Sequence, residues 1–211
     1  MEKARGINGW VIVLALPVGL LVLAIFIGRL FYIPYYVPSQ SMEPTFQIGD
    51  QFLVDKNGAH PPAVGDIVVV RDKDRHVRIV RVVALGGDRV EMRDGIPLVN
   101  GVAARQRPDG EMTVTSAEQT VTAQRFIEQL PHERGTHRVL DTGYSAGDEI
   151  APVIVPAGHF FALGDNRDNA ADSRFDDMQF GLGTPPVTDI IGKAVFIYGS
   201  RDRSRRWSRL R

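Results

Sequence analysis

An uncharged apolar run near the N-terminus restricts most strongly what this chain can fold into. Residues 10–28 read WVIVLALPVGLLVLAIFIG, and the apolar stretch continues at 30–33 beyond Arg29. An α-helix rises about 1.5 Å per residue, so about 20 apolar residues are needed to cross the hydrocarbon core of a bilayer. We therefore predict a transmembrane helix over residues 10–33, preceded by a cytoplasmic segment of residues 1–9.

The residues on either side of this run indicate its orientation. Lys3 and Arg5 precede it and only Arg29 follows closely, which by the positive-inside rule leaves the N-terminus in the cytoplasm. A cleaved secretory signal is the alternative, but the run is longer than the usual apolar region of about 7–15 residues and no A-x-A-like site follows it. We expect a retained, single-pass anchor in the cell (inner) membrane, with the lipid bilayer as a partner and the main domain outside.

Charge and cysteine content exclude several classes of protein. The chain has no cysteine, so disulfides, thiolate metal sites and cysteine nucleophiles are impossible. Its net charge of zero is unevenly distributed, because residues 201–211 contain six arginines and one aspartate. This basic tail suits either a solvated surface or an anionic lipid surface. We expect no nucleic acid partner, and the histidines show no metal-ligand spacing, so no metal or cofactor is expected.

Short runs rich in Val and Ile between turn signals predict a mostly β fold. They lie at 51–54, 66–70, 77–83, 89–92 and 96–99, and further runs follow at 153–161 and 193–198. Asp94-Gly95 predicts a hairpin, since both central positions of a type I′ turn need positive φ. The expected β core therefore has two parts, residues 37–100 and 151–200.

The segment between the two parts of the core differs from them in composition. Residues 101–150 are polar and poor in aromatic side chains. We interpret them as a small inserted subdomain, with a short helix over 117–129.

Two polar segments are candidates for the chemistry. Residues 38–45 read PSQSMEPT, where Pro38 and Pro44 prevent a regular helix and so present Ser41 on a stiff loop. Far downstream, residues 164–174 read GDNRDNAADSR, a cluster of side chains that can form bidentate Arg–carboxylate bonds and Asn-capped turns.

These two segments together resemble the type I signal peptidases, the membrane-anchored Ser/Lys peptidases of the S26 kind. That family carries P-S-x-S-M-x-P-T after a membrane span and GDNRDNS-x-DSR later in the chain. The resemblance implies a signal-peptidase-type β-fold, with Ser41 as nucleophile and Ser39 contributing to the oxyanion hole. It also implies shallow pockets for small substrate residues, lined by Val37, Pro38, Met42 and Ile79. Structural support is implied for Arg81, Asp165, Asp172 and Arg174.

The chain departs from the family where the general base belongs. The family lysine opens a K-R-x-x-G-x-P-G-D strand, and counting back from Gly87-Asp88 places Val80 at that position. The family serine beside the lysine corresponds to Ala170, and the aromatic residue two positions before the lysine corresponds to Arg78. Valine cannot take a proton, so the base is unknown. His76 and Lys73 are weak candidates because they precede the same strand, and histidine titrates near neutral pH.

Two functions remain open. The first is a membrane-bound serine endopeptidase that removes N-terminal signal peptides from exported proteins after small residues. The second is a catalytically inactive relative, anchored beside the protein-export channel, that binds signal peptides or a partner peptidase. A self-cleaving repressor with a Ser/Lys β-fold is disfavoured, since the chain has an apolar N-terminal run and no leading helix-turn-helix.

Overall fold

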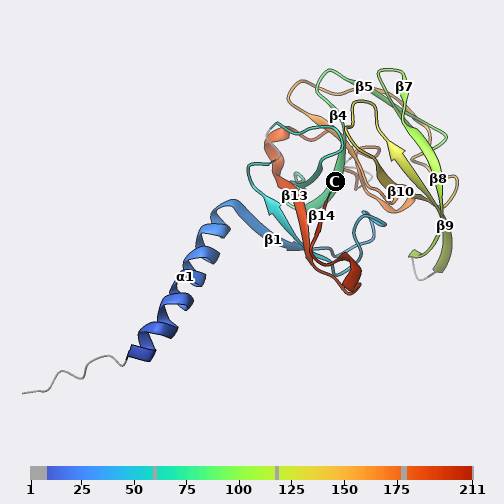
Figure 1. The fold of residues 1–211 in the computed structure, drawn as a ribbon. Helices are drawn as coiled ribbons and strands as arrows, with labels where there is room; N and C mark the ends of the chain where they lie inside the picture. Colours follow the sequence, from blue (N-terminus) through green and yellow to red (C-terminus); the bar gives the residue numbers. More distant parts are fainter. Residues whose placement is uncertain (1–8, 59–60, 117–118, 177–179, 211) are drawn as a thin grey trace, which may run out of the picture.

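The computed structural model describes residues 9–58, 61–116, 119–176 and 180–210, with only the backbone at 9–16, 115–116 and 119. Helix α1 (Gly9–Phe31) projects away from a body of β-strands (Figure 1). The strands, in chain order, are β1 (Tyr32–Tyr36), β2 (Gln51–Asp55), β3 (Ile67–Arg71), β4 (Val77–Leu85), β5 (Arg89–Arg93), β6 (Ile96–Val99), β7 (Val102–Ala103), β8 (Arg105–Ser116), β9 (Gln119–Gln129), β10 (His137–Asp141), β11 (Ile150–Ile154), β12 (Phe160–Leu163), β13 (Ile190–Gly199) and β14 (Ser208–Arg209). Short 3-10 helices η1 (Arg167–Asn169), η3 (Val187–Asp189) and η4 (Arg203–Arg205) lie between them.

The N-terminal helix is shorter than the predicted anchor. It ends at Phe31 because the next residues pair with another strand, Tyr32 opposite Asp55 and Pro34 opposite Leu53. Lys56 closes the helix end by donating its Nζ to the carbonyl of Arg29 at 2.9 Å. In the part of the chain that the structure describes, no helix is both long and apolar enough to cross a membrane, so the anchor predicted over 10–33 is not supported there.

The main sheet carries the strands around the Ser41 loop. Its order is β1-β2-β13-β3-β4-β12, with β14 added beside β13, and all of these neighbours are antiparallel. The strands predicted at 51–54, 66–70 and 77–83 correspond to β2, β3 and β4. The strand predicted at 193–198 belongs to the longer β13, and it is followed by a further strand, because the C-terminal chain turns back to pair with it.

Two smaller sheets complete the described fold. One has the order β11-β5-β6-β7, and its β5–β6 turn contains Asp94 at φ 47° and Gly95 at φ 74°, which confirms the predicted hairpin. The other has the order β10-β9-β8 and is built from residues 105–141. The helix predicted over 117–129 is wrong, since residues 119–129 form β9. Residues 117–118 lie outside the described residues.

The cross-strand partner explains this error. The segment QTVTAQRFIEQ contains the β-branched residues Thr120, Val121, Thr122 and Ile127, and β9 pairs with β8 along its length, for example Val121 opposite Val114. A chain segment with mixed local preference takes the conformation that satisfies its backbone across a neighbouring strand. The inward side of this sheet buries Val114, Ala123 and Leu140.

The main sheet carries two apolar clusters, one of which includes residues of the Ser41 loop. One contains Phe46 and Phe52, whose ring centroids lie 4.8 Å apart, and it extends over β2, β3 and β13. The other lies over β3, β4 and β12 and includes Val80. Burial of aromatic and branched side chains on both sides of β3 and β4 provides a rigid base for the loop.

Candidate active site

The hydroxyls of Ser39 and Ser41 lie close together in the wall of a cavity. Their Oγ atoms lie 3.2 Å apart, within hydrogen-bonding distance, and Ser41 is half-buried. The cavity has a volume of about 840 Å³ and is lined by both serines. Its walls also come from the start of β4 and from residues 168–172. The two segments singled out in the sequence, more than a hundred residues apart, therefore form one site.

The downstream segment holds the backbone of the serine loop directly. The backbone N–H of Asn166 donates to the carbonyl of Ser41 at 3.1 Å, and its side-chain amide donates to the carbonyl of Gln40 at 3.1 Å. Gly164 packs so closely that a Cβ built on it would lie 2.6 Å from the Ser41 carbonyl oxygen and 2.3 Å from Cβ of Ala170. The position of Ser41 thus depends on a glycine and an asparagine of the other segment.

A buried ion pair connects the serine loop to β4. Arg81 and Asp165 are both about 1% exposed, and two guanidinium nitrogens donate to the carboxylate at 2.8 and 2.7 Å. Thr45, on the serine loop, donates its hydroxyl to the same carboxylate, while Arg81 also donates to the carbonyl of Gly65 at 2.8 Å. Because both charges are satisfied at short range, the pair orders three separate segments.

The other predicted support pair is also formed. Arg174 donates to both carboxylate oxygens of Asp172 at 2.9 Å, and both side chains are fully buried. Asp172 in turn accepts the backbone N–H of Gly164 at 2.9 Å. The pair therefore fixes the glycine that contacts Ser41.

Apolar side chains occupy the cavity wall where the resemblance implies a lysine and a serine. Val80 and Ala170 both line the cavity together with Ser41. Arg78 lines it too, and its guanidinium is held by Asp72 at 2.9 Å and by the carbonyl of Ala171 at 3.1 Å.

The two candidate bases occupy different environments. His76 lines the cavity, its Nδ1 lies 3.4 Å from Oδ2 of Asp72, and its side chain is 72% exposed. Asp72 also accepts the backbone N–H of His76 at 2.8 Å, which fixes the turn. Lys73 is exposed and is not among the residues that line this cavity.

The residues implied for the substrate pockets divide into two groups. Pro38 and Ile79 line the cavity. Val37 and Met42 are about 2% and 1% exposed and belong to the core cluster against which Ile79 packs. Among the described residues, no group of three or more His, Asp or Glu side chains could hold a metal ion.

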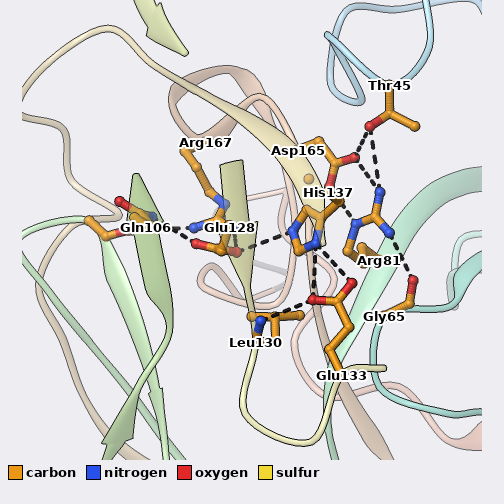
Figure 2. A network of polar contacts seen from close by, with 12 residues as sticks. Thr45, Gly65, Arg81, Gln106, Glu128, Leu130, Glu133, His137, Asp165 and Arg167 are labelled. Atoms are coloured by element: carbon orange, nitrogen blue, oxygen red, sulfur yellow. Dashed lines mark hydrogen bonds and ion pairs between the residues drawn. The ribbon is translucent and has the colours of Figure 1, made fainter. Parts of the chain in front are cut away.

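A second buried polar network, which the sequence analysis did not anticipate, joins the β10-β9-β8 sheet to the site (Figure 2). Arg167 forms an ion pair with Glu128, whose Oε2 also accepts from Gln106 at 2.7 Å. His137 lies between two carboxylates, 3.2 Å from Glu128 and 3.0 Å from Glu133. The charged groups come from β9, β10, the turn between them and the 164–174 segment, and β8 adds the neutral amide of Gln106, so no contiguous sequence signal marks the network.

The charges of this network favour a protonated imidazole. Burial by itself would lower the pKa of His137, and the positive charge of Arg81 acts in the same direction. The adjacent carboxylates of Glu128 and Glu133 outweigh both effects, and the pKa of His137 is raised from its usual value. The pKa of Asp165 is lowered, since Arg81 overcomes the desolvation that burial imposes on the carboxylate. With a protonated His137, the network has three positive groups, His137, Arg81 and Arg167. These match its three carboxylates, Glu128, Glu133 and Asp165.

Gly164→Ala tests the contact with the serine loop. The new methyl group would overlap the Ser41 carbonyl and Ala170, so we expect unfolding to become easier by about 1–3 kcal/mol, measured by urea denaturation. The matched control is Gly135→Ala, where a built Cβ meets nothing within 4 Å. Equal effects of the two substitutions would contradict the proposed close contact.

The raised pKa of His137 predicts a pH-dependent stability. The imidazole titrates near pH 6.5 in the unfolded chain and at higher pH in the folded chain. The contribution of His137 to the free energy of unfolding is therefore complete below pH 6.5 and is lost as pH rises through the folded pKa. We expect the stability advantage of wild type over His137→Gln to shrink from about pH 6 to pH 9. Chemical denaturation at each pH measures it, and a difference independent of pH would refute the charged imidazole.

Comparison with known proteins identifies relatives over most of the chain. The sequence model of the family described as "Signal peptidase, peptidase S26" matches residues 9–199. Signal peptidase I of Pseudomonas fluorescens is 34% identical over 191 residues, which cover 79% of this chain and 64% of that protein. Signal peptidase I of Bacillus licheniformis is 28% identical over 200 residues, which cover 93% of this chain and 91% of that protein.

A solved structure is also similar in part. The crystal structure of a signal peptidase I from Enterococcus faecalis has a TM-score of 0.35 and 20% identity, covering 63% of this chain and 95% of that one. The chain spans about 64% of the length of the Pseudomonas relatives. The family match over residues 9–199 confirms the resemblance inferred from the two motifs: the chain belongs to the signal peptidase family, peptidase S26.

Proposed function

We propose that this chain is a membrane-attached serine endopeptidase that removes N-terminal signal peptides from exported proteins after small residues. The observation that carries the proposal is the pair of hydroxyls of Ser39 and Ser41, 3.2 Å apart in a cavity of about 840 Å³. The names of the relatives, signal peptidase I in Pseudomonas and Bacillus, support the substrate class.

The start of β4 supports binding of an extended peptide. Residues 77–80 pair with β3 on one side, while β12 pairs with β4 only from Arg81 onward. Residues 77–80 also line the cavity, so backbone groups on their other side face it. An added strand would satisfy these groups and carry its scissile carbonyl past Ser41, with alternate side chains directed toward Pro38 and Ile79.

In the proposed reaction the Oγ of Ser41 attacks the scissile carbonyl carbon, and the Ser39 hydroxyl donates to the oxygen that becomes negative. The amine leaves with a proton, and water then hydrolyses the acyl-enzyme. We assign the proton transfer to His76, whose ring is oriented by Asp72 within the same cavity. The resemblance implies a base at position 80, and His76 lies about 13 Å from that position along an extended chain. The 72–76 turn must therefore close toward Ser41 when peptide binds, so that the imidazole comes within hydrogen-bonding distance of the hydroxyl.

The second candidate function is peptide binding without cleavage. It is favoured by Val80 and Ala170, whose apolar side chains line the cavity beside Ser41 where the resemblance implies a lysine and a serine. The open side of β4, held in place by the buried Arg81–Asp165 pair, would then bind a signal peptide or the equivalent strand of a partner peptidase.

A cleavage assay tests the proposal: the purified full chain, in lipid, is offered a preprotein with an A-x-A site. We expect Ser41→Ala to abolish cleavage, while binding of the substrate persists, because the hydroxyl is needed for chemistry and the cavity is needed for binding. Equal cleavage by wild type and Ser41→Ala would exclude the enzyme. Binding without cleavage by wild type would establish the second function.

Variants of the two base candidates separate their roles in the same assay. His76→Gln is expected to reduce kcat by about 100-fold or more, as removal of a general base does. Lys73→Ala is the matched control from the same turn and should leave the rate unchanged. The opposite result would transfer the role of base to Lys73.

Membrane attachment is part of the proposal and rests on α1 and the adjoining aromatic residues. The apolar side chains of the helix from Val18 onward are about half exposed or more, and Tyr36 is 67% exposed. We expect the full chain to float with liposomes and a variant carrying Leu21→Asp and Phe26→Asp to remain in the soluble fraction. Flotation of both to the same extent would refute attachment through α1.

A further inference from the structure

The arginine-rich C-terminal segment is a built part of the fold, whereas the sequence suggested either a solvated tail or a lipid contact. Asp202 caps η4 by accepting from the backbone N–H and hydroxyl of Ser204 at 2.9 and 2.7 Å. β14 pairs with β13, Phe196 opposite Arg209, and Leu210 donates its N–H to the carbonyl of Val195 at 3.1 Å. The segment lies beyond residue 199, where the family match ends.

Arg205 of this segment contacts the serine loop at residues that do not line the cavity of Ser41. Its guanidinium donates to the carbonyls of Pro44, at 3.3 Å, and Thr45. The same group donates to the carboxylate of Asp50 at 2.9 Å. Asp50 is 1% exposed and closes the loop by accepting the N–H of Gln47 at 2.9 Å. One planar group therefore joins the middle of the loop that carries Ser41, at Pro44 and Thr45, to its C-terminal end at Asp50.

The charge of Arg205 also acts on the loop. Glu43, two residues after Ser41, is buried, and this burial raises its pKa, whereas the positive charge of Arg205 opposes the rise. A second cavity, of about 410 Å³, lies beside these contacts and is lined by Pro44, Thr45 and Arg205. Loss of the guanidinium would remove a donor from two carbonyls, and it would leave the buried Asp50 carboxylate without its positive partner although the N–H of Gln47 still donates to it.

We propose that Arg205 is a positioning residue for Ser41: the C-terminal segment clamps the back of the serine loop and holds the nucleophile at the correct depth in the cavity. The proposal rests on the proposed peptidase function for its kinetic consequence. Its structural consequence, a rigid loop at residues 41–46, does not depend on catalysis.

Arg205→Ala in the full chain tests the clamp by two measurements. Hydrogen–deuterium exchange at residues 42–46 should become faster, since the Phe46 N–H to Met42 carbonyl bond of 2.8 Å loses its external support. Preprotein cleavage should lose about 100-fold in kcat with KM changed less than about twofold, because the clamp aligns the nucleophile without touching the substrate. Millimolar methylguanidinium should restore part of the rate by entering the second cavity.

Arg203→Ala is the matched control, an exposed arginine of the same 3-10 helix, and should leave exchange and kcat unchanged. Arg205→Lys keeps the positive charge near Glu43 but lacks the several donors of the planar guanidinium, so it should recover less than half of the lost kcat. The same variant replaces Arg205→Ala in both measurements if Arg205→Ala does not fold. Unchanged exchange at 42–46 in Arg205→Ala would overturn the clamp. Absence of cleavage by wild type would refute the peptidase, and the exchange result would still decide the clamp.

Discussion

The buried ion pair between Arg81 and Asp165 is the interaction on which the arrangement of the site depends. It joins β4 to the 164–174 segment, and through Thr45 it reaches the loop that carries Ser41. Removal of one member of such a pair leaves an uncompensated buried charge, which typically costs about 3–5 kcal/mol. The pair therefore stabilises a single relative placement of three segments that are far apart in the sequence.

Around this pair the structure combines an intact support with an altered reaction centre. Asp172, Arg174, Gly164 and Asn166 hold the backbone of the serine loop through short hydrogen bonds and close packing. The cavity wall next to Ser41 is apolar at Val80 and Ala170. A peptidase therefore needs a proton acceptor that reaches Ser41 from another part of the cavity. If His76, oriented by Asp72, accepts the proton, the chain is a peptidase; if it does not, the chain is a peptide-binding relative.

The β10-β9-β8 sheet is coupled to the same centre by electrostatics. Its Glu128 contacts both His137 of the same sheet and Arg167, which lies in the segment that positions Ser41. Ordinary sequence patterns revealed the β5–β6 hairpin and most strands of the main sheet, since those depend on local turn geometry and on side-chain alternation. The same patterns suggested a helix where β9 forms, because its conformation is decided by pairing with β8.

The sequence by itself determined the family and the identity of the candidate nucleophile, because those depend on two contiguous motifs, each short and unusual in composition. It also determined what is absent from the expected base position, since a valine at residue 80 cannot carry a proton. Only the tertiary structure decided which groups surround Ser41 and what holds them. The contacts of Arg205 with Pro44 and Asp50, and of His137 with Glu128 and Glu133, depend on the closing of long loops in the chain. The energies of such contacts depend on burial and distance, which do not follow from residue type or spacing.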